Sequence, residues 1–144
     1  MAFSGNFMCT SFKKELMEAK HNFLLSGGNT FRMALYDDDS SFTAATTAYT
    51  STDEKSGTNY TAKGESLTRI DPTTSSTTAY TDFADVAWST ATFSAMGAMI
   101  FNDSASGDPS VLILDFGALK TATAGTFTVA FPAADASNAS IRIA

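Results

Sequence analysis

The chain has 144 residues, of which 44% are hydrophobic and 12% aromatic, so it is long and apolar enough to bury the core of one domain. Its formal net charge is −6 at pH 7, and its nine basic residues are scattered along the sequence. Binding to nucleic acid or to an anionic membrane needs a concentrated positive surface, so this charge argues against both functions.

Cysteine content and the N-terminal sequence indicate synthesis in a reducing cytoplasm. Cys9 is the single cysteine, so no disulfide can form within the chain. The first residues lack the basic start and apolar run of a secretion signal. No stretch reaches the roughly 20 apolar residues that span a bilayer. We therefore expect a cytoplasmic product without a membrane anchor.

The N-terminal part of the chain predicts an arm followed by a helix. Residues 1–10 are expected to form an N-terminal arm that is flexible or ordered by a partner. Over residues 11–23 apolar side chains recur at helical spacing, which predicts one amphipathic helix. Ser11 is the expected N-cap, and Gly27-Gly28 is expected to end the segment.

After these glycines the pattern changes to β. Phe31–Tyr36 alternates in the way of a strand with one buried face. The Thr- and Ser-rich segment 42–79 is expected to hold short strands at 60–62 and 67–70. Residues 71–78 are expected to form a loop.

The C-terminal half predicts strands separated by turns. The expected strands are 80–88 with a bulge near 83–85, 93–101, 111–116, 126–131 and a short closing strand around Ile141 and Ile143. Turns are expected at 89–91 and 102–109, and a connector of small residues at 117–125. Residues 111–116 are apolar on both faces, which is typical of a central strand.

These elements predict a mainly β fold. We expect an antiparallel β-sandwich or barrel-like domain of about seven or eight short strands with one N-terminal helix. This single domain should occupy residues 11–144, after the arm of residues 1–10. Phe127, Val129 and Phe131 are expected to point into its core.

Catalytic residues are sparse in the sequence. His21 is the single histidine, so a Ser-His-Asp or Cys-His arrangement would have to use it, with Cys9 as the candidate nucleophile. His21 at the end of the predicted helix has an ordinary structural explanation, because a cation there suits the helix dipole. We therefore expect no catalytic residues and no enzymatic activity.

Metal and cofactor motifs are equally weak. Three adjacent carboxylates at 37–39 could offer oxygen ligands to Ca²⁺, but they point in different directions and lack the twelve-residue loop pattern. One cysteine and one histidine exclude a zinc site, and the glycines form no phosphate-binding motif. We expect no metal and no cofactor, and we interpret residues 37–39 as a solvated turn.

Five side chains are candidates for partner binding. Phe3, Phe7 and Met8 lie in the expected arm, and Tyr49 and Tyr60 lie in the Thr-rich segment. Their neighbours are small residues, so local core burial is not evident from the sequence. An arm that becomes ordered only on assembly would add contact area at an entropic cost.

A series of short motifs, each weak but consistent in order, resembles a family of small structural proteins in the virions of tailed phages. The residues that carry the resemblance are 12–16, 21–23, 31–36, 47–50, 57–64, 82–88, 114–117 and 125–127. The resemblance covers most of residues 12–143. It supplies no catalytic motif.

This resemblance implies a virion component, and most specifically a capsid cement or decoration protein of the phage head. Such a protein would be made in the host bacterial cytoplasm and bind the major capsid protein on the capsid exterior. By analogy it would be a homo-oligomer, commonly a trimer. The alternative is a tail, baseplate or fibre component that binds a partner protein or a carbohydrate.

Overall fold

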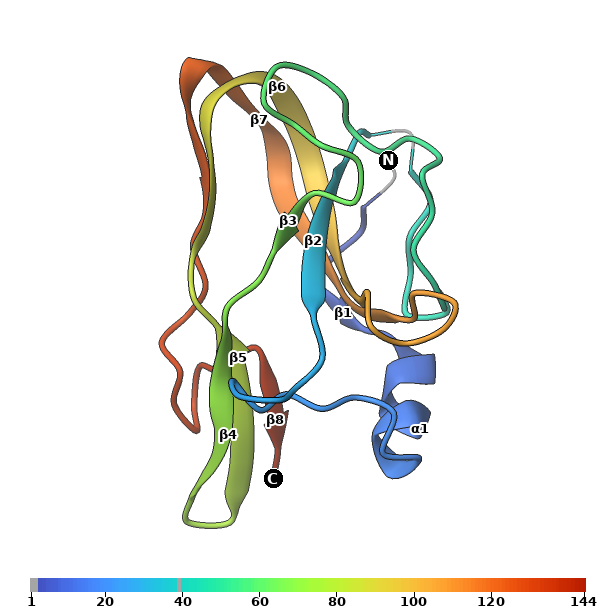
Figure 1. The fold of residues 1–144 in the computed structure, drawn as a ribbon, viewed down its shortest axis with the longest axis vertical. Coiled ribbons are helices and arrows are strands. Elements are labelled where there is room, and N and C mark those ends of the chain that lie inside the picture. The colour runs from blue at the N-terminus through green and yellow to red at the C-terminus, as the bar shows by residue number, and fades with distance from the viewer. Residues whose placement is uncertain (1–2, 39) are drawn as a thin grey trace.

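The protein is mainly β, with 48% of residues in strands and 6% in a helix, arranged as two antiparallel sheets in a sandwich-like fold (Figure 1). The computed structural model describes residues 3–38 and 40–144, and this part contains eight strands and one short helix. The predicted fold class is therefore confirmed. In chain order the elements are β1 (Phe7–Met8), α1 (Thr10–Met17), β2 (Phe31–Tyr36), β3 (Glu65–Ser66), β4 (Arg69–Ser75), β5 (Thr78–Phe83), β6 (Val86–Asn102), β7 (Ser110–Val129) and β8 (Ile141–Ile143).

The larger sheet has the order β1-β7-β6-β2-β3, and the smaller sheet has the order β4-β5-β8. β2 pairs with β6 without interruption, from Phe31 opposite Asn102 to Tyr36 opposite Gly97. The predicted strands at 31–36 and 141–143 are confirmed. The apolar start of β7 lies between β1 and β6, as its two apolar faces predict.

β6 and β7 form a long antiparallel ribbon, from Val86 opposite Val129 to Phe101 opposite Ser110. Figure 1 shows this ribbon rising from β5 and folding over at its upper end. Register shifts interrupt the pairing along β6, and bulges of this kind bend strands. The predicted turn at 89–91 and the connector at 117–125 are therefore wrong, because both segments lie within the paired ribbon.

Phenylalanine is the most frequent residue type in the core between the layers. Phe23 stacks on Phe31 at a ring-centroid distance of 4.4 Å, and Phe93 lies 5.1 Å from Phe127. Trp88 is 2% exposed and contacts the same cluster. Each side chain of this size contributes roughly 1.5–3 kcal/mol when it is fully buried. Phe127 is buried as predicted, whereas Val129 and Phe131 are only half-buried.

The helix is shorter than the periodicity predicts. α1 ends at Met17, and Ala19 has a positive φ of 55° that a right-handed helix cannot contain. Beyond this point the chain turns back, so that the His21 ring reaches the carboxylate of Glu15. The N-cap is Cys9, which makes no side-chain capping bond, so the expected cap at Ser11 is also wrong.

The segment between β2 and β6 also departs from the sequence prediction. Residues 71–78 belong to the hairpin of β4 and β5 rather than to a loop. Pro72 is tolerated there because it lies on the outer strand, at a register shift between Ile70 and Thr73 where its missing N–H is not needed for pairing. Residues 60–62 are not in a strand, and a turn begins at Thr61, whose carbonyl accepts from the Gly64 N–H. That turn leads into Gly64, where a Cβ would lie 1.7 Å from the Met33 carbonyl oxygen, so glycine is required.

Candidate functional site

Phe3 belongs to the core of this chain. It is 1% exposed, and its ring lies 5.8 Å from Phe42 in an edge-on contact. A Cβ at Gly97 would come within 2.5 Å of the Phe3 ring, so this glycine on β6 makes room for it. In this conformation Phe3 has almost no surface to offer a partner.

Phe7 and Met8 join the larger sheet as its outermost strand. In β1 they pair with Ile113 and Leu112 of β7, and the Cys9 N–H donates to the Val111 carbonyl at 3.0 Å. Both side chains are half-buried. Residues 3–9 therefore lie against the sheets, and Phe7 and Met8 keep part of their surface open to solvent.

A groove that we call the edge groove runs between the two sheets beside β1. Its cavity of about 470 Å³ is lined by residues 6–8, 112–116, 129–132, 138–140 and Arg142. Phe7, Phe116 and Phe131 are half-buried there, while Asn138 and Arg142 are exposed. The groove thus combines apolar side chains with a polar margin, as protein-binding sites commonly do.

The edge groove is flanked by the outer strands of both sheets. β1 ends the larger sheet and β8 ends the smaller one. An edge strand leaves one row of backbone N–H and C=O groups without a ladder partner, and such rows can pair with an added strand. The geometry can therefore accept an extended segment that pairs along an edge and fills the groove.

Sequence reasoning found only Phe7 and Met8 of this groove. It missed Phe116 and Phe131, which it assigned to the core or to a strand end, and Arg142, which it did not single out. These residues are far apart in the chain and meet only because the ribbon folds back toward β8. The closing-strand pattern at Ile141 and Ile143 was the one signal for the far wall.

A smaller apolar groove lies between α1 and the smaller sheet. It has a cavity of about 200 Å³, lined by Leu16, Phe23, Pro72, residues 79–81, Ile141 and Ile143. Ile143 is 61% exposed and Met17 on the adjacent helix is 84% exposed. Leu16 and Phe23 place one wall of this groove on the N-terminal segment.

Tyr49 and Tyr60 hold their own loop in place. The hydroxyl of Tyr49 donates to Glu54 Oε2 at 2.5 Å, and that of Tyr60 donates to Glu54 Oε1 at 2.9 Å. The Lys63 N–H donates to the same Oε1 at 2.6 Å. Burial raises the pKa of both tyrosines, so both hydroxyls remain protonated donors.

The two tyrosine rings face inward from this loop. The Tyr49 ring stacks on Phe101 at 4.7 Å, and the Tyr60 ring stacks on Trp88 at 6.2 Å. Both side chains are half-buried. The structure thus separates these two residues from Phe7 and Met8, and sequence reasoning missed Glu54, which joins them.

Cys9 and His21 are enclosed rather than exposed. Cys9 is 0% exposed, and burial raises the pKa of its thiol in spite of a hydrogen bond with Ser110. The His21 side chain is 0% exposed and lies among the rings of Phe12, Phe23 and Phe31. A substrate would have no access to either group in this conformation.

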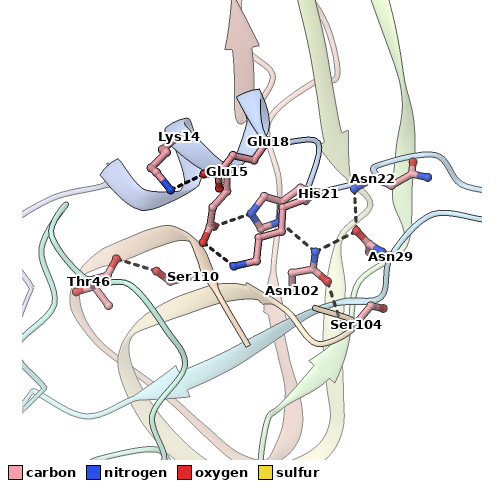
Figure 2. Close-up of polar contacts among 11 residues, drawn as sticks. Lys14, Glu15, Glu18, His21, Asn22, Asn29, Thr46, Asn102, Ser104 and Ser110 are labelled. Carbon is pink, nitrogen blue, oxygen red and sulfur yellow. Dashed lines mark hydrogen bonds and ion pairs between the residues drawn. The ribbon is translucent and has the colours of Figure 1, made fainter. Parts of the chain in front are cut away.

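The ring nitrogens of His21 are both bonded (Figure 2). Nε2 lies 2.8 Å from Glu15 Oε2, and Nδ1 lies 3.0 Å from Asn102 Nδ2. Burial lowers the pKa of His21 despite the neighbouring carboxylate. Burial alone would raise the pKa of Glu15, but hydrogen bonds from His21 and Lys20 outweigh it and hold that pKa below its usual range.

Of the three carboxylates expected in a turn at 37–39, Asp37 is engaged by a lysine. Asp37 accepts from Lys55 Nζ at 2.7 and 2.8 Å, and Asp39 lies outside the described residues. Among residues 3–38 and 40–144, no group of three or more His, Cys, Asp or Glu side chains is placed to hold a metal ion.

In the described part of the chain, no helix has the length and apolar character needed to cross a membrane. Comparison of the sequence with protein-family models and with curated proteins, and of the structure with solved structures, returns no match.

Proposed function

We propose that this chain is a structural component of a phage virion that acts through protein–protein contact, and specifically a capsid cement or decoration protein. It would bind the major capsid protein on the outside of the head and stabilise the shell. By analogy with proteins that sit at symmetry axes, its copies would form a trimer. Synthesis would take place in the host bacterial cytoplasm.

The edge groove is the observation that carries this proposal. Two edge strands flank a cavity with half-buried Phe7, Phe116 and Phe131, which suits an extended segment of a neighbouring subunit. The motif series in the sequence supplies the virion assignment, and the groove supplies a place for the contact. Enclosure of Cys9 and His21 supports a role that does not use nucleophilic chemistry.

The mechanism would be mass action. A protein that binds only the closed shell stabilises it by an amount that grows with concentration over the dissociation constant. Many copies, each contacting more than one capsid subunit, add avidity to modest individual contacts. The acidic charge of −6 would help to keep the unbound copies soluble.

Co-sedimentation with expanded, undecorated capsids tests the proposal. Ala130 is exposed and lines the edge groove, whereas Ala118 is exposed on β7 and does not line it. Ala130→Arg should therefore weaken binding by about tenfold or more, and Ala118→Arg should leave it unchanged.

The possible failures are distinguishable. Wild-type protein that stays in the supernatant at near-saturating concentration would contradict the cement function. Equal binding by both arginine variants would retain the function and reject the edge groove as its contact. Binding to tail structures but not to capsids would support the tail or baseplate alternative.

A further inference from the structure

Two backbone N–H groups determine which atom donates and which accepts in each hydrogen bond around His21. The Ser104 N–H donates to Asn102 Oδ1 at 3.0 Å, and the Asn22 N–H donates to Asn29 Oδ1 at 2.8 Å. Backbone N–H groups cannot accept, so both side-chain oxygens are assigned. Asn102 Nδ2 must then face His21 Nδ1 and Asn29 Oδ1, each at 3.0 Å.

This assignment determines the tautomer of His21. An amide NH2 group only donates, so Nδ1 of His21 must accept from Asn102. The ring proton is therefore on Nε2, which donates to Glu15 Oε2 at 2.8 Å. The bonds that run from Glu15 through His21 and Asn102 to Asn29 connect the N-terminal segment to the end of β6, and we call them the latch (Figure 2).

Protonation of the ring is incompatible with this arrangement. An imidazolium carries a proton on both nitrogens, so its Nδ1–H would face the two N–H groups of Asn102 Nδ2. Rotating the Asn102 amide would provide an acceptor. It would also leave the Ser104 N–H and Asn29 Oδ1 without these partners.

We propose that protonation of His21 breaks the latch and loosens residues 11–29 from the sheets, so that the N-terminal segment responds to pH. This inference does not depend on the proposed function. The charged groups that face His21 are Glu15 and Lys20, both from the N-terminal segment. β2 and β6 present the neutral side chains of Phe31 and Asn102. Asp103, next to Asn102, is bound to Lys63.

The two charges act in opposite directions. Glu15 favours the imidazolium and Lys20 disfavours it, while burial disfavours it most. The pKa of His21 is therefore lowered, so the stability that the latch contributes is fully present above the ordinary histidine value of 6.5 and is lost progressively as pH falls from 6.5 to the lowered pKa. Glu15, whose pKa is below its ordinary 4.5, stays ionised in this range.

Loosening of the segment would alter the surface of the protein. Residues 11–29 carry the exposed side chains of Met17, Leu24 and Leu25. They also carry Leu16 and Phe23, which form one wall of the apolar groove beside β8. The Cys9 N–H stays bonded to the Val111 carbonyl and the Thr10 N–H to the Ala44 carbonyl, so the movement would begin after Thr10.

Hydrogen exchange and histidine NMR of the full chain test the proposal between about pH 7.5 and about pH 5. His21 is the single histidine, so its imidazole signals are unambiguous. Protection factors of amides in residues 12–29 should fall by up to about tenfold per pH unit between 6.5 and the lowered pKa. Amides of β2 and of the paired β6 and β7 should keep their protection.

Two variants isolate the latch. His21→Gln cannot titrate, so it should remove the pH dependence of the segment. Asn102→Asp offers Nδ1–H an acceptor but leaves Asn29 Oδ1 without its Asn102 donor, so it should raise the pKa of His21 above that of the wild type although it removes the last bond of the latch. The imidazole titration of the wild type and Asn102→Asp still decides the question if His21→Gln does not fold.

The contradicting results are equally definite. A wild-type His21 that titrates at or above 6.5 would overturn the proposal. So would protection of residues 12–29 that is independent of pH or that declines equally in His21→Gln. A parallel decline in the ribbon would show global unfolding rather than a local latch, and would also overturn it.

Discussion

Two regions of similar composition reach order by different means. Residues 117–126 of β7 and the loop 40–64 are both rich in Thr and Ala and both contain glycine. The first lies within β7 and pairs with β6 at residues 120–122 and at Gly125, between register shifts, as in Phe93 opposite Ala122 and Ser94 opposite Thr121. The second has few ladder contacts and depends on Glu54, which accepts three hydrogen bonds within the chain.

The difference shows that a small-residue sequence takes its structure from what lies beside it. β6 offers backbone partners to residues 120–122 and Gly125, so even alanine and glycine are held in a strand here despite the register shifts. The loop 40–64 makes isolated bridges rather than a ladder and uses half-buried tyrosine rings and one carboxylate instead. We therefore expect that destabilising the ribbon unfolds the whole domain, whereas destabilising the loop opens only residues 40–64.

The largest effect should come from the aromatic core under the ribbon. Phe127 contacts the rings of Trp88, Phe93 and Phe116. Phe127→Ala should lower the free energy of unfolding by about 3–5 kcal/mol, because it leaves a cavity as well as losing buried surface. Chemical denaturation measures this change. An unchanged midpoint would show that the face of β7 has been misassigned.

An intermediate effect should come from the centre of the loop. Glu54→Ala removes the acceptor for Tyr49, Tyr60 and the Lys63 N–H, and should cost about 2 kcal/mol. Glu54→Gln keeps one acceptor oxygen and should cost less. Asp53→Asn is the matched control, because it removes a neighbouring exposed charge and retains a residue that tolerates positive φ.

The comparison also predicts which residues lose protection in Glu54→Ala. Hydrogen exchange of Glu54→Ala should accelerate in residues 40–64 while the paired amides of β6 and β7 stay protected. Equal acceleration in both regions would remove the distinction between them.

The smallest effect should come from Lys63. Its Nζ lies 2.7 Å from Asp103 and 2.9 Å from Asp108, and the side chain is 37% exposed. It also lies 5.5 Å from the centre of the Tyr49 ring. Lys63→Met keeps the apolar stem and should cost about 0.5–1 kcal/mol, since exposed ion pairs are weak. Added salt should reduce the difference from wild type, and a loss that does not respond to salt would indicate packing instead.

Local sequence patterns correctly predicted those strands whose structure does not depend on contacts with distant parts of the chain. The alternation of Phe31–Tyr36 and the apolar start of β7 give strands, because their side chains match a buried sheet. The helix could not be bounded at Met17, since its end depends on the return of His21 to Glu15. The strand conformation of residues 117–125 could not be predicted either, because it depends on pairing with β6.

The candidate site was predictable to a lesser degree. Phe7 and Met8 stood out as apolar residues among small ones, and they line the edge groove. Tyr49 and Tyr60 stood out for the same reason, yet their hydroxyls are bonded to Glu54. The sequence has no signal that separates an aromatic residue holding its own loop in place from an apolar residue lining a binding groove, since both lie among small residues.

An electron-microscopy map of the virion tests the central claim most directly. We predict many copies of this chain on the outer surface of the head, with the edge groove beside β1 and β8 occupied by a segment of a neighbouring subunit. A few copies confined to the tail, or copies on the head whose edge groove faces open solvent, would contradict the account.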